Sequence, residues 1–114
     1  MPSVIVVPET EDFEFIVSHE NFVWINENLG NPKLEERNAT YLAPLWIKDG
    51  YVSRIYHIIE AVFGTERYIK LGNSFILTRH WRNHGQSRRF EYHDLKEFSM
   101  VEIAPGLLFE IDGS

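Results

Sequence analysis

Short runs of β-branched and aromatic residues, separated by turn-forming residues, recur along the chain. The first run, Val4–Val7, is continuously apolar and ends at Pro8, which predicts a strand buried on both faces. Runs of the same kind predict further strands at Phe22–Ile25, Phe90–His93, Met100–Ile103 and Leu107–Ile111. Pro105 and Gly106 form a good turn pair between the last two. Many short strands in a short chain indicate a small barrel or a strongly bent sheet.

The segment Thr10–His19 is predicted to be a helix. Its first residue is a good cap, and two acids follow in the first turn, where the helix dipole favours negative charge. Phe13, Ile16 and Val17 recur at helical spacing and would share one face. Phe13, Phe15 and Val17 also alternate as in a strand, but the cap and the acids favour the helix.

The stretch between the second strand and residue 50 is irregular in pattern. Residues 26–38 are rich in charge and turn formers, which predicts a loop with one helical turn at Lys33–Arg37. Thr40–Ile47 predicts a strand, and because Pro44 cannot donate to a ladder, this strand lies on an edge or carries a bulge. Lys48–Gly50 is a hairpin turn of the Asp-Gly kind.

Residues 51–63 fit a helix and a strand equally well on pattern alone. Their apolar residues recur at spacings of three and one, yet most of them are β-branched or aromatic. Tyr68–Leu71 and Phe75–Thr78 then predict a hairpin with a turn at Gly72 and Asn73. Further on, Asp94 is expected to cap a single turn that reaches Phe98.

Composition limits the classes of function. The 114 residues make one domain, with an apolar fraction of 44%, as in ordinary globular proteins. There is no cysteine, so disulfides, thiolate metal sites and a cysteine nucleophile are excluded. The apolar run at the N-terminus is too short for a signal peptide, and none approaches the ~20 residues needed to cross a bilayer. We therefore expect a cytoplasmic protein that does not enter a membrane.

The net charge of −6 is unevenly distributed. Residues 1–36 have eight acids and one base, and residues 94–114 have five acids and one base, whereas residues 37–93 have nine bases and four acids. The acidic total argues against bulk non-specific binding to nucleic acid. Chance scatter would explain the pattern, but it is also compatible with one basic face on the domain.

The stretch from Arg79 to Arg89 is the main candidate for function. It holds four arginines, one tryptophan and two histidines without any acid, and it is expected to be a long loop between two strands. Arginine binds phosphate in two-point geometry, and the Trp81 ring offers a face on which a base can stack. The alternative is an exposed loop whose arginines pair with carboxylates of the same domain or of a protein partner.

The order of elements resembles the PUA-like barrel superfamily, which includes the EVE, ASCH and YTH domains. The resemblance rests on four stretches: Val4–Val7 followed by a helix, Phe22–Ile25 with its central tryptophan, Tyr41–Pro44 with Tyr51–Ile58, and Glu102–Leu108. It implies an α+β fold, a small mixed barrel of about six strands over residues 1–114 with one helix near the N-terminus. It also implies that residues 51–63 begin as a strand and that Trp24 lines a pocket.

Such domains read RNA or modified bases with aromatic residues around a pocket and basic residues at its mouth. Our first hypothesis is therefore a nucleic-acid-binding module that needs no cofactor. Its expected contact residues are Trp24, Tyr41, Trp46, Arg54, Arg79, Trp81, Arg82, His84, Arg88 and Arg89. The alternative is a protein-interaction or homodimeric assembly domain whose basic loop docks on an acidic partner or on a second copy.

The histidines are candidates for metal binding and for acid–base chemistry. His80 and His84 are four residues apart, a spacing that holds zinc on a helix, but the glycine that follows them indicates a loop, and we expect no metal site. His57 lies in an apolar run and is expected to be a core histidine. A third hypothesis is a metal-independent ribonuclease that uses His84 or His93. No nucleophile motif or phosphate-binding glycine loop supports an enzyme.

Overall fold

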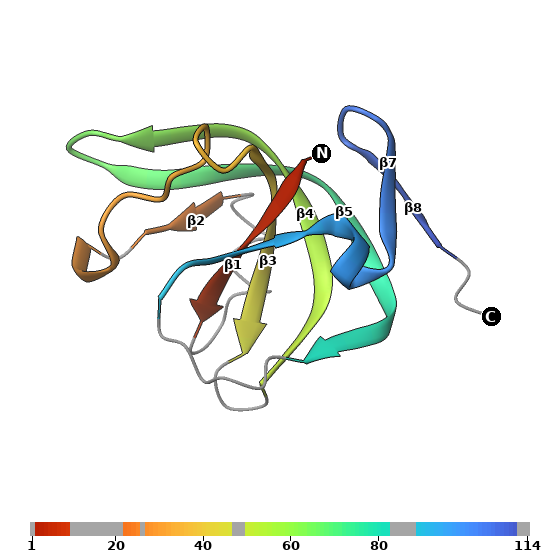
Figure 1. Cartoon of the computed structure of the whole chain (residues 1–114). Coiled ribbons are helices and arrows are strands. Elements are labelled where there is room, and N and C mark those ends of the chain that lie inside the picture. The colour runs from red at the N-terminus through yellow and green to blue at the C-terminus, as the bar shows by residue number, and fades with distance from the viewer. Residues whose placement is uncertain (1, 10–21, 26, 47–49, 83–88, 112–114) are drawn as a thin grey trace.

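The computed structural model describes residues 2–9, 22–25, 27–46, 50–82 and 89–111, and strands account for 68% of them. The strands are β1 Ser3–Glu9, β2 Phe22–Trp24, β3 Ala39–Trp46, β4 Tyr51–Phe63, β5 Arg67–Arg82, β6 Glu91–Asp94, β7 Met100–Ala104 and β8 Leu107–Glu110 (Figure 1). Two short 3-10 helices accompany them, η1 Glu27–Leu29 and η2 Leu95–Phe98.

Six strands form one strongly curved sheet in the order β2-β5-β4-β3-β1-β6 (Figure 1). β1 and β3 run parallel, and the other neighbours in this sheet are antiparallel. In the described part of the chain, β2 and β6 each pair on one side only, so the sheet is not closed by hydrogen bonds. β7 and β8 form a separate hairpin beside it.

The curved sheet has a core on each face, and β1 contributes to both. Val4 and Val6 pack into a first core with residues of β3, β4, η2 and the hairpin. Ile5 and Val7 pack into a second core with residues of β2, β3, β4 and β5. All four side chains are at most 2% exposed. This confirms the prediction of a first strand buried on both faces, because successive side chains of a strand point to opposite faces.

The hairpin is attached to the sheet by polar and apolar contacts. The hydroxyl of Tyr41, a fully buried β3 residue, donates to Glu102 Oε2 at 2.5 Å and accepts from the Gly106 amide at 3.1 Å. Burial, and then the hydrogen bond to Glu102, raises the pKa of Tyr41 well above its usual value of 10.0. On β8, Glu110 accepts hydrogen bonds from the backbone amide and the hydroxyl of Thr78.

The α+β barrel of about six strands is wrong for the described residues, which form eight strands in two sheets and no α-helix. After β6, a capping box stabilises the start of η2: the Asp94 side chain accepts a hydrogen bond from the Lys96 amide, and the Glu97 side chain accepts one from the Asp94 amide. This turn leads the chain away from the sheet, so the last two strands pair with each other. The helix expected at residues 10–19 lies outside the described residues.

Several local predictions are confirmed. Residues 51–63 form a strand throughout, which resolves the ambiguity in their pattern. The predicted turn at Lys33–Arg37 is closed by a hydrogen bond from the Arg37 amide to the Lys33 carbonyl. Pro44 lies in the central strand β3, so the edge position is wrong, and the ladder to β4 shifts register near it as a bulge requires.

Two predictions about β5 are wrong. The expected hairpin turn at Gly72 and Asn73 is absent, because β5 runs straight through both residues. A Cβ on Gly72 would stand 3.0 Å from Ile59 Cγ2, so this glycine permits close approach of the two strands. The loop expected at residues 79–89 begins later, because β5 continues to Arg82 by pairing with β4. Residues 83–88 lie outside the described part.

Candidate functional site

The candidate contact residues that the structure describes do not form one site. Trp24 lies opposite Tyr68 at the start of β5, whereas Arg79, Trp81 and Arg82 lie at its other end (Figure 1). Tyr41 is fully buried and holds the hairpin, so it is not accessible to a ligand. Among the remaining candidates, Arg89 is exposed, Trp46 is described in its backbone only, and His84 and Arg88 lie outside the described residues.

The ring of Trp81 is packed against other parts of the fold. Its ring centroid lies 4.8 Å from that of His93 and 5.0 Å from that of Phe98, and it packs on the first core. These contacts fill the space between the end of β5 and β6, which are not hydrogen-bonded neighbours. The ring therefore packs against β6, η2 and the first core, and it is not free to act as the stacking platform that the sequence suggested.

An exposed face on β4 and β5 contains an aromatic pair that sequence reasoning missed. The rings of Tyr51 and His80 are stacked, with centroids 4.6 Å apart and planes at 5°. Tyr51 is directly opposite Arg82 in the ladder, and the His80 and Arg82 side chains are exposed. The sequence suggests His80 only as a potential metal ligand, because a ring contact with a residue 29 positions away leaves no local signal.

Two further arginines belong to this neighbourhood. Val52 and Ile55 both point into the first core, so Tyr51 and Arg54 lie on the opposite face of β4. Arg54 is half-buried, and its guanidinium lies 3.5 Å from the Ser74 hydroxyl. Arg79 is exposed within residues 77–80 of β5, a bulge opposite Ser53 alone. We call Tyr51, Arg54, Arg79, His80 and Arg82 the basic face.

Among the described residues, no carboxylate forms an ion pair with the arginines of the basic face. The basic face contains three arginines and no acid. None of the ion pairs found between described residues involves Arg54, Arg79 or Arg82, so their guanidinium groups are not held by described carboxylates. For these three arginines, the alternative of intramolecular pairing therefore finds no support in the described part of the chain. Exposed guanidinium groups without a carboxylate partner, such as those of Arg79 and Arg82, are suited to bind phosphate.

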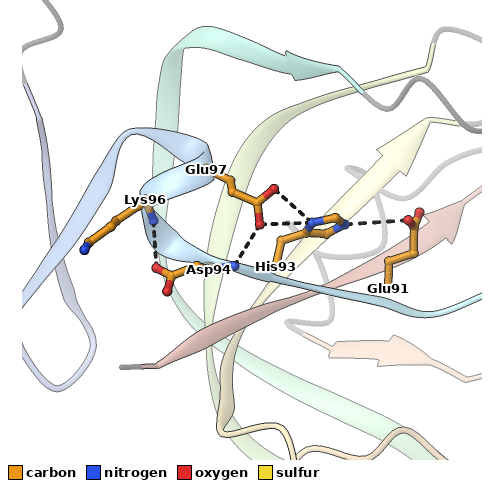
Figure 2. Close-up of polar contacts among 5 residues, drawn as sticks. All are labelled: Glu91, His93, Asp94, Lys96 and Glu97. Atoms are coloured by element: carbon orange, nitrogen blue, oxygen red, sulfur yellow. Dashed lines mark hydrogen bonds and ion pairs between the residues drawn. The ribbon is translucent and has the colours of Figure 1, made fainter.

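His93 is enclosed by two carboxylates (Figure 2). Its Nδ1 lies 3.1 Å from Glu97 Oε2 and must donate, because a carboxylate only accepts. Its buried Nε2 lies 3.6 Å from Glu91 Oε1, too far for a hydrogen bond. Both ring nitrogens thus face the protein itself, and His93 is not placed to exchange a proton with a substrate.

Two shallow pockets lie elsewhere, between residues 31–40 and the outer half of β4. Their volumes are about 530 and 390 Å³, and Leu34 and Glu35 line both. Glu36 and Glu60 also border them, against one base, Lys33. This acidic lining is unfavourable for phosphate, so the pockets and the basic face favour ligands of opposite charge.

The described residues also bear on metal binding and on membrane insertion. No group of three or more His, Asp or Glu side chains in the described ranges could hold a metal ion. The described helices include none with the length and apolar character needed to cross a bilayer. In comparisons with known proteins, no family model, no curated protein and no solved structure matches the chain significantly.

Proposed function

We propose that the chain is a nucleic-acid-binding module that holds a single strand on the basic face of β4 and β5. The observation that carries the proposal is the stacked pair of Tyr51 and His80 with Arg82 beside it. An unpaired base can stack on an exposed ring of this kind, and a neighbouring guanidinium can donate hydrogen bonds to the adjoining phosphate. The resemblance to PUA-like domains leads to the same class of ligand, with RNA or a modified base as the expected substrate.

Base stacking and phosphate contacts together would give weak binding that depends on the salt concentration. Stacking of a base on an aromatic side chain contributes about 1–3 kcal/mol. Phosphate contacts by arginine release counterions from the nucleic acid and dominate affinity at low salt. The overall charge of −6 opposes binding elsewhere on the surface, so the basic face confines the ligand to one region.

Fluorescence anisotropy with labelled single-stranded RNA and DNA tests the proposal. The double variant Arg79→Glu/Arg82→Glu should weaken binding by at least about tenfold and flatten the dependence of log K on log salt by about 1.4. Removing the stacking ring in His80→Ala should also weaken binding, by about 1–3 kcal/mol, but leave the salt slope unchanged.

The matched control is Lys33→Glu/Lys70→Glu, which changes the net charge equally at two exposed positions away from the basic face. It should retain most of the wild-type affinity. Equal losses in the two double variants would show that only total charge matters. Absence of binding by the wild-type chain to every strand at low salt would refute the proposed function.

A further inference from the structure

The β7–β8 hairpin has two faces of different chemistry. Side chains on its inner face are used within the molecule: Met100 and Leu108 are buried in the first core, and Glu102 and Glu110 accept hydrogen bonds from the curved sheet. The outer face consists of Val101, Ile103, Leu107 and Phe109, continued by Ile111, and we call it the apolar face.

The apolar face is exposed to an unusual degree. Phe109 and Ile103 are 63% and 61% exposed, and the other three side chains are 37–46% exposed. Isolated apolar residues are normal on a protein surface, but five contiguous ones on one small sheet are not. Five such side chains present on the order of 400–500 Å², a size at which surface patches are often functional.

We propose that the apolar face binds a second copy of this chain, with two hairpins packed face to face around a two-fold axis. Such an interface is self-complementary, because apolar side chains meet apolar side chains and no charge is buried. The two copies would bury on the order of 800–1,000 Å² of apolar surface, at the lower limit for a specific contact. The expected product is a weak dimer in concentration-dependent exchange with the monomer.

Charge gives this dimer a distinctive salt dependence. Each copy carries −6, so two copies repel, while the contact surface itself is neutral. Added salt screens the repulsion and leaves the apolar contact intact, so dimerisation should strengthen as salt increases. Nucleic-acid binding should weaken under the same change. The interface is also on different strands from the basic face, so either proposal can fail alone.

Sedimentation velocity of the full chain, from micromolar to near-millimolar concentration and at low and high salt, tests the inference. The wild-type chain should shift from monomer to dimer with concentration. Phe109→Glu places a carboxylate at the centre of the face in both copies and should raise the dissociation constant by more than about tenfold. Ile103→Glu, on the partner strand of the hairpin, should have the same effect.

The matched control is Ile59→Glu, because Ile59 is 52% exposed but lies on β4, outside the hairpin. This variant should dimerise like the wild type. Thermal unfolding establishes that each variant folds, and either variant of the apolar face suffices for the comparison. A wild-type chain that stays monomeric throughout, or a dimer that tolerates both Phe109→Glu and Ile103→Glu, would overturn the inference.

Discussion

Trp24 and Trp81 lie near opposite ends of the β5 ladder, and their surroundings differ completely. Trp24, on the edge strand β2, is 50% exposed, and its ring meets those of Phe22 and Tyr68 edge-on on the surface. Trp81 is half-buried against two rings from β6 and η2. The same residue type is thus exposed on an edge strand in one place and packed between elements of the fold in the other.

The difference shows that position in a curved sheet, more than residue type, determines the role of a large aromatic. A strand with neighbours on both sides directs its side chains into a core on at least one face, whereas an edge strand has less to cover it. At the end of β5 the curvature brings β6 close, and the gap between them has to be filled by side chains.

The largest expected effect comes from removing the ring that fills this gap. Trp81→Ala should lower the free energy of unfolding by about 2–4 kcal/mol, because it leaves a cavity beside the first core. Urea denaturation measures the change. A loss below about 1 kcal/mol, comparable to surface substitutions, would show that the ring does not brace the sheet.

The polar attachment of the hairpin should have an intermediate effect. Tyr41→Phe deprives Glu102 and the Gly106 amide of their partner and should cost about 1–2 kcal/mol near neutral pH. The raised pKa of Tyr41 implies that its contribution is complete below pH 10.0, the unfolded value, and declines as the pH rises further, since the unfolded chain loses this proton first.

Unfolding free energies measured between about pH 9 and 11 therefore separate the two chains. The difference between wild type and Tyr41→Phe should shrink as the pH increases. A difference that stays constant across this range would mean that the hydroxyl is no harder to ionise in the folded protein than in the unfolded chain.

The smallest expected effect belongs to the exposed tryptophan. Trp24→Ala removes two edge-on ring contacts and should lower the free energy of unfolding by about 0.5–1.5 kcal/mol. Urea denaturation under the conditions used for Trp81→Ala allows direct comparison. If the two substitutions lower the free energy of unfolding equally, the contrast between the exposed Trp24 and the packed Trp81 is refuted.

Local sequence signals predicted those elements that depend on local physics. The run Val4–Val7, the cap at Asp94 and the turn at Pro105 and Gly106 each follow from residue preferences within a few positions, and all three are confirmed. Gly72 was misleading because glycine serves both turns and close strand contacts, and only the presence of Ile59 across the ladder distinguishes them.

The candidate site was less accessible from the sequence, because it depends on pairing between distant residues. The arginines at positions 79 and 82 were identified by their type, and they do lie on an exposed surface. The stack of Tyr51 on His80 requires the β4–β5 register with its bulge, which no local pattern contains. For the same reason the sequence predicts that Trp24 and Trp81 contribute to one binding region, although they lie near opposite ends of β5.

The register of a strand with apolar side chains on both faces is less restricted than that of a strand with one apolar face. In most sheets, a shift of one strand's register by one residue moves its apolar side chains to the solvent face and lowers the stability of the fold. For β1 a shift by one residue would keep most of the side chains of Val4–Val7 buried, because both faces are core, although Ser3 or Pro8 would then enter a buried position. Burial of these four side chains therefore specifies the alignment only weakly. That task falls to the anchors at its beginning, where the Ser3 hydroxyl and amide bond to the carbonyls of Arg37 and Asn38 at 2.6 and 2.8 Å. Engineered extensions at this terminus should therefore preserve Ser3.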